Sequence, residues 1–130
     1  MNRRSTPEAD AQRAIVQALR VALPRDAIVH HCANEVTDGG PCGAKRQSIL
    51  VGMGVHAGFA DLIVISGGRI LFLEVKSETG RLRKSQEVFR ETVCAQGFGW
   101  ALVRSVDDAL AALADNGFTS RVRPPLRAQP

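Results

Sequence analysis

Two acidic residues and a lysine near the middle of the chain have the types and the spacing for chemistry with a metal ion and water. Asp61 begins one apolar run, Glu74 and Lys76 end the next, and Gly67-Gly68 separates the two runs. A glycine pair between β-branched runs is typical of a two-residue hairpin turn. Counting back from this turn along both strands puts Asp61 directly opposite Glu74. Lys76, two residues further on, points to the same face.

This predicted face combines charged side chains with an apolar surface. Directly opposed side chains on a sheet have Cβ atoms about 4.5–5.5 Å apart, and like charges in that position destabilise the pairing. Below Asp61 and Glu74 the face carries only apolar residues, which are Ile63, Ile65, Ile70 and Phe72. A divalent cation between the two carboxylates offsets their repulsion, because hard oxygen ligands suit magnesium. The alternative is a solvated cluster of charges at a strand end, which is unusual beside a buried apolar row.

The elements that must position these residues follow from apolar periodicity, capping residues and proline or glycine breaks. In chain order we predict the helix 6–23, the strand 27–32, the strands 61–66 and 69–76, the helix 82–96, the strand 98–103 and the helix 106–115. Residues 34–58 have no clear periodicity, and we expect a long loop there. Both faces of the hairpin are apolar, which indicates a central sheet covered by helices on both sides.

Length, charge and cysteine content limit the class of protein. The 130 residues suit one domain, expected over 7–117, with an extension 1–6 and a basic tail 118–130 rich in proline and arginine. Five arginines at these ends account for the net charge of +4, and the body has 12 basic and 13 acidic residues. No apolar run suits a membrane span. With no signal-peptide pattern and no disulfide or zinc spacing, we expect the cytoplasm of a bacterial or phage-infected cell.

Two further polar residues are expected near the carboxylates. Glu8 shares a helical face with Ile15 and Leu19, so it turns toward the sheet. An acid in the first turn also complements the helix dipole, and both roles stay open. Gln86 replaces an apolar residue on the inner face of its predicted helix. A buried amide needs hydrogen-bond partners, either in the site around Asp61 or in the backbone.

Taken together, these segments resemble the virus-type replication-repair nuclease domain, VRR-NUC, of the PD-(D/E)xK superfamily. The matching residues are the glycine-rich approach 52–60 with Asp61 and Leu62, the segment 72–77, the segment 80–82, Gln86, Asn34-Glu35 and the helix of Glu8. The resemblance covers roughly residues 7–115, and Ala60 stands where the family usually has proline. It implies an α/β fold with a restriction-endonuclease-like core, in which helices flank a mixed β-sheet in the order αβββαβα.

The resemblance also implies an enzyme, a magnesium- or manganese-dependent endonuclease that hydrolyses phosphodiester bonds in DNA. The implied metal ligands are Asp61, Glu74, the carbonyl of Val75 and, directly or through water, Glu8. Lys76 would orient or deprotonate the attacking water, with Gln86 supporting the site. Stand-alone members of this size resemble junction resolvases. We therefore expect a homodimer that nicks four-way junctions or other branched DNA.

Basic residues near these segments offer contacts to DNA phosphates. They are Lys45, Arg46, Arg81, Arg83 and Lys84. A solvated face is an equally good account of each of them. The alternative function is a non-catalytic, structure-specific DNA-binding module with a nuclease-like fold. The intact set of Asp61, Glu74 and Lys76 favours the enzyme.

Overall fold

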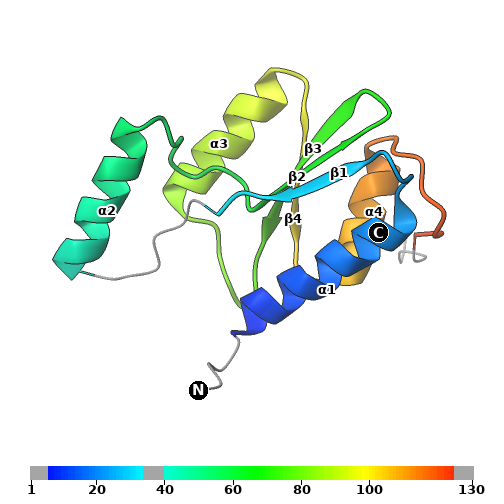
Figure 1. Cartoon of the computed structure of the whole chain (residues 1–130), viewed down its shortest axis with the longest axis horizontal. Coiled ribbons are helices and arrows are strands. Elements are labelled where there is room, and N and C mark those ends of the chain that lie inside the picture. Colours follow the sequence, from blue (N-terminus) through cyan, green and yellow to red (C-terminus); the bar gives the residue numbers. More distant parts are fainter. Residues whose placement is uncertain (1–5, 34–39, 125–130) are drawn as a thin grey trace.

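The computed structural model describes residues 6–33 and 40–124, which form one four-stranded sheet and four helices (Figure 1). The elements are α1 (Pro7–Ala22), β1 (Ile28–His31), α2 (Gly40–Gly52), β2 (Leu62–Ser66), β3 (Arg69–Val75), α3 (Lys84–Ala95), β4 (Gly99–Val103) and α4 (Val106–Asp115). The strand order is β1-β2-β3-β4, with β3 and β4 parallel and the other neighbours antiparallel. This mixed sheet with flanking helices confirms the predicted α/β fold class.

Local capping chemistry sets the starts of two helices. The Thr6 hydroxyl accepts the N–H of Ala9 at 3.1 Å, and Pro7 occupies the first position of α1. The Ser105 side chain caps α4 in the same way by accepting the N–H of Asp108 at 3.1 Å. Both starts agree with the sequence prediction. No helix within residues 6–33 and 40–124 is long and apolar enough to cross a membrane.

The β2–β3 hairpin has the predicted register. The two glycines of its turn have φ values of 59° and 74°, which suit a two-residue turn that matches the twist of the strands. The last pair of the ladder joins Leu62 to Leu73. Asp61, the residue before β2, therefore comes opposite Glu74, as the sequence predicted.

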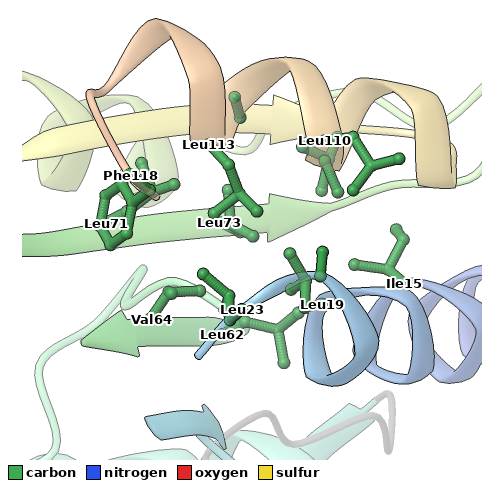
Figure 2. Packing of buried hydrophobic residues seen from close by; sticks show 14 of the residues in the cluster. Ile15, Leu19, Leu23, Leu62, Val64, Leu71, Leu73, Leu110, Leu113 and Phe118 are labelled. Carbon is green, nitrogen blue, oxygen red and sulfur yellow. The ribbon is translucent and has the colours of Figure 1, made fainter. Parts of the chain in front are cut away.

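One face of the sheet packs against α1 and α4 and forms the main apolar core (Figure 2). The core residues labelled there are Ile15, Leu19, Leu23, Leu62, Val64, Leu71, Leu73, Leu110, Leu113 and Phe118. Phe118 lies just beyond the predicted domain end, yet it is buried in this core. The chain stays attached as far as Arg121, whose N–H donates to the carbonyl of Ala22 at 2.7 Å. The burial of this layer anchors the sheet on the side away from Asp61 and Glu74.

The opposite face is covered only in part. Phe72 of β3 packs edge-on against Phe59 and Phe89, with ring centroids 5.6 and 5.3 Å away. The helix that supplies Phe89 is α3, the crossover between the parallel strands β3 and β4, so it lies over that half of the sheet. Ile65 of β2 is 39% exposed. Helices therefore lie on both sides of the sheet, as predicted, but α3 covers only part of its face.

The expected loop over residues 34–58 is wrong for its central part, which forms α2. Residues 34–39 lie outside the described ranges. In Figure 1, α2 stands apart from the sheet, and Ile49 and Met53 near its end are 54% and 80% exposed. A helix that buries no continuous apolar face has no strong helical period in its sequence. The element order is thus αβαββαβα, with one helix more than predicted.

The segment that leads into Asp61 packs directly on the start of α3. Gly58 has a φ of 78°, and a Cβ atom there would lie 2.1 Å from the carbonyl oxygen of Ser85. Gly54 has a φ of 106° but nothing within 4 Å of the corresponding position. The two glycines share a left-handed backbone and differ in the space around them.

We predict that Gly58→Ala destabilises the protein more than Gly54→Ala does. The φ strain alone costs about 1–2 kcal/mol for alanine, and overpacking against the α3 backbone adds about 1–3 kcal/mol. Urea unfolding followed by circular dichroism measures both free energies of unfolding. Equal losses in the two variants contradict the close approach of Gly58 to Ser85.

Candidate active site

Polar side chains lie together on one face of the sheet where β3 ends. We call Asp61, Glu74 and Lys76 the carboxylate row. The β1–β2 register continues to Cys32 and Asp61, and the Cys32 N–H donates to the Asp61 carbonyl at 2.8 Å. On the next strands Glu74 pairs with Leu102. Asp61 and Glu74 are only 5% and 1% exposed. Two carboxylates are thus buried side by side on the central strands, on the face that also carries Phe72.

The Asp61 carboxylate is bound to the backbone of β3. Its Oδ2 accepts the N–H of Val75 at 2.8 Å. The next residue, Lys76, donates its N–H in the other direction, to Val103 of β4 at 3.1 Å. The N–H and carbonyl of one strand residue point to the same side. The Val75 carbonyl therefore points toward the β2 side, where Asp61 lies.

Glu74 is held by two side chains. Its Oε1 accepts a hydrogen bond from Gln86 Nε2 at 2.9 Å and lies 3.6 Å from Lys76 Nζ. Gln86 also uses its own Oε1 to accept the N–H of Arg83 at 2.9 Å, at the start of α3. Gln86 and Lys76 are 3% and 6% exposed. The buried amide has both kinds of partner that the sequence left open, one in the site and one in the backbone.

These donors fit a magnesium- or manganese-type cation. Asp61, Glu74 and the Val75 carbonyl supply hard oxygen atoms at one edge of the sheet. In the described part of the chain, no three histidine, cysteine, aspartate or glutamate side chains come together in a group that could hold a metal. Magnesium does not need such a cage, since it is usually held by one or two carboxylates and keeps several waters. The residues present therefore suit that ion better than zinc.

Glu8 approaches Asp61 from the other side. Both residues line a cleft of about 460 Å³ between the first turns of α1 and the end of β1, together with Gln12 and His31. Glu8 is half-buried. It does not join Asp61 and Glu74 in a three-carboxylate cluster. Glu8 and Asp61 therefore line the same cleft, and a role of Glu8 at a metal stays a prediction.

The five basic residues expected at DNA divide into two groups. Arg81 and Arg83 are exposed in the segment that leads into α3, and Lys84 is exposed at the first position of this helix. Lys45 and Arg46 are exposed on α2, the helix that stands apart from the sheet. Three of the five therefore lie at the start of α3, the helix that also supplies Gln86, and two lie on a separate element.

Two neighbours of the site were not predicted from the sequence. Cys32 had no assigned role, yet the β1–β2 register puts it beside Asp61. Arg104 follows β4 directly, where the parallel register with β3 brings it next to Lys76. The sequence does show Arg104 as a polar residue immediately after an apolar strand. Its position beside Lys76 could not be predicted, because the register of β4 depends on how α3 crosses the sheet.

One comparison with known proteins supports the fold. No family model and no curated protein matches the chain. The described part of the chain combines a mixed four-stranded sheet with flanking helices. A solved structure described as "VRR_NUC domain protein" matches with a TM-score of 0.63 and 19% identity, over 95% of this chain and all of that one. The fold is that of a VRR-NUC domain, as the resemblance of the sequence implied.

The position of Cys32 beside Asp61 can be tested by the reactivity of its thiol. Burial raises the pKa of the Cys32 thiol, and the negative charge of Asp61 raises it further. A raised pKa leaves less reactive thiolate at pH 8, so Cys32 is alkylated slowly by iodoacetamide. Asp61→Asn keeps an oxygen for the Val75 N–H but removes the charge. We expect faster alkylation of Cys32 in this variant, by a factor below the roughly tenfold change of one full pKa unit.

Mass spectrometry of the alkylated peptides measures this rate against two internal controls. Cys42 and Cys94 are exposed and free, and their alkylation stays the same in wild type and Asp61→Asn. An unchanged Cys32 rate in a folded variant contradicts the pairing of Cys32 with Asp61.

Proposed function

We propose that this protein is a divalent-metal-dependent DNA endonuclease. The observation that carries the proposal is the buried pair Asp61 and Glu74, opposed on one face of the sheet with Lys76 beside them. Burying two acids together is costly unless a cation offsets their charge. Lys76 supplies one positive charge, and the oxygen atoms around the pair suit a second, divalent one.

The residues divide the work of phosphodiester hydrolysis among them. Asp61, Glu74 and the Val75 carbonyl would hold a magnesium or manganese ion, with Glu8 acting through water. Gln86 fixes the orientation of Glu74 by its 2.9 Å hydrogen bond. A bound divalent ion lowers the pKa of its water and neutralises charge on the phosphate. Lys76 orients or deprotonates the attacking water and stabilises the negative charge that develops on the phosphate.

The DNA backbone lies across the exposed basic residues that lead into α3. Phosphate contacts of this kind position the duplex without reading its sequence. Arg81, Arg83 and Lys84 are exposed there, and Lys45 and Arg46 of α2 extend the same role to a second element. A protein that binds mainly to phosphates recognises the shape of DNA, and we propose four-way junctions or other branched DNA as the substrate.

The test incubates the protein with linear duplex, flap and four-way-junction DNA, with magnesium, manganese or a chelator. We expect cleavage only with a divalent ion, and most on a branched substrate. Glu74→Gln abolishes cleavage because it removes a ligand charge. Lys76→Met keeps an unbranched stem and removes the ammonium, and it lowers the cleavage rate by about 100-fold or more while DNA binding persists.

Two variants of matched chemistry serve as controls. Glu91→Gln makes the same change at an exposed position of α3, and it leaves cleavage unchanged. Lys84→Ala removes an exposed ammonium, so it weakens DNA binding and leaves the maximal rate of cleavage. Binding of DNA without cleavage under every metal condition rejects the enzyme in favour of a structure-specific DNA-binding module. Equal losses of binding and cutting in Lys76→Met make Lys76 a phosphate contact.

We also propose that the protein acts as a homodimer. One chain offers one carboxylate row, whereas resolving a four-way junction requires two symmetric nicks. A two-fold homodimer supplies both sites with one interface. Sedimentation equilibrium at micromolar concentration is expected to give twice the 14.0 kDa mass of the chain. A strict monomer changes the expected substrate from junctions to flaps or single nicks.

A further inference from the structure

Arg104 holds the turn that follows Lys76. Its Nη1 donates to three main-chain carbonyl oxygens, at 2.5 Å to Ser77, 3.2 Å to Glu78 and 2.8 Å to Gly80. The turn is closed by its own hydrogen bond, from the Gly80 N–H to the Ser77 carbonyl at 3.2 Å. One guanidinium nitrogen thus lies among three carbonyl oxygens. It is their hydrogen-bond donor in place of water.

The sheet itself places Arg104 next to Lys76. Val75 pairs with Val103 in the parallel ladder, and both side chains are fully buried on the core face. The following residues, Lys76 and Arg104, therefore point to the other face, side by side on neighbouring strands. Two adjacent cations repel each other, but the three carbonyls bind the guanidinium and compensate its charge. The N–H of Arg104 is also fixed, by a 2.9 Å hydrogen bond to Asp108.

The turn that Arg104 holds lies against the stem of Lys76. A Cβ atom on Gly80 would lie 3.4 and 3.5 Å from Cβ and Cδ of Lys76. This packing leaves Lys76 6% exposed, with Nζ 3.6 Å from Glu74 Oε1. A lysine side chain carries about 2 kcal/mol of rotamer entropy when it is free. Its ammonium stays at Glu74 only while something confines the stem, and the 77–80 turn does so.

We propose that Arg104 is a positioning residue, which fixes the Lys76 ammonium at Glu74 by holding the 77–80 turn against the lysine stem. The catalytic part of this proposal rests on the endonuclease function. Arg104 itself touches neither of the two carboxylates in the contacts described above. It acts through the turn, and loss of the turn lets Lys76 adopt other rotamers and lets water reach its stem.

The first experiment measures the exposure of Lys76 directly, with no need for catalysis. The full chain is treated briefly with an amine-acetylating reagent, and the rate at each lysine is read by mass spectrometry. Lys45 and Lys84 are exposed and serve as internal references. We expect slow labelling of Lys76 in wild type and several-fold faster labelling in Arg104→Gln. The matched control is Arg90→Gln, which removes a half-buried arginine that stacks on Trp100, and it leaves the Lys76 rate unchanged.

The second experiment measures cleavage of DNA by the same variants. Arg104→Gln lowers kcat by about 10- to 100-fold, the scale expected for a misplaced catalytic group, and changes KM little. Arg104→Lys recovers part of the loss, because an ammonium can donate to the same carbonyls. Arg90→Gln retains the wild-type kcat. If Arg104 has a purely structural role, Arg104→Gln and Arg104→Lys both lower the stability of the protein. In that case kcat does not fall independently of KM, and lysine does not rescue kcat.

The outcomes separate this proposal from the proposed function. Unchanged Lys76 labelling in a folded Arg104→Gln overturns the positioning role, even if the protein cleaves DNA. If Arg104→Gln does not fold, Arg104→Lys is measured instead: its partial rescue predicts labelling of Lys76 that is faster than in wild type, and a rate equal to wild type overturns the role. If wild-type protein cleaves no DNA but Lys76 is labelled faster in Arg104→Gln, the endonuclease function is refuted. The positioning of Lys76 by Arg104 is then still supported. A kcat equal to wild type in Arg104→Gln with exposed Lys76 rejects the catalytic part.

Discussion

The antiparallel pairing of β2 with β3 is the constraint on which the site depends. Its two-residue turn fixes the register from Leu62–Leu73 outward, and this register puts Asp61 opposite Glu74. A slip of one residue would move the acids to opposite faces of the sheet. It would also expose the leucines that now pack against α1 and α4. Core packing and the placement of the acids are therefore enforced by the same set of backbone hydrogen bonds.

The two faces of the sheet have separate tasks. On one face, α1 and α4 bury leucine and valine side chains and supply most of the hydrophobic stabilisation. On the other, α3 covers only β3 and β4, so the carboxylate row lies at the border of an incomplete layer. An acid in the middle of the main core would have no access to a substrate, and one on an open surface would be fully hydrated. At this border Asp61 and Glu74 are desolvated, while the cleft beside Asp61 stays open.

Local sequence patterns were sufficient to predict the carboxylate site, because its central part is a hairpin. The glycine pair and the strand period determine which side chains share a face, and Asp61, Glu74 and Lys76 follow from them. The partners of Arg104 could not be predicted in this way. Its position beside Lys76 depends on the parallel β3–β4 register, which is set by the packing of α3 over some twenty intervening residues. Helix α2 was missed for a different reason, since its apolar residues are not gathered on a buried face.

The hydrogen bond from the Val75 N–H to the Asp61 carboxylate has a consequence for how the site communicates with its scaffold. Backbone N–H groups in a sheet usually bind carbonyls, whose charge does not change with ligand or pH. Here the acceptor is an ionic side chain, so the strength of a main-chain bond in β3 depends on the charge state of Asp61. A ligand that draws negative charge away from Asp61 would weaken this bond. The chemical shift and the hydrogen exchange of the Val75 amide would then report a change of charge at Asp61, on the neighbouring strand.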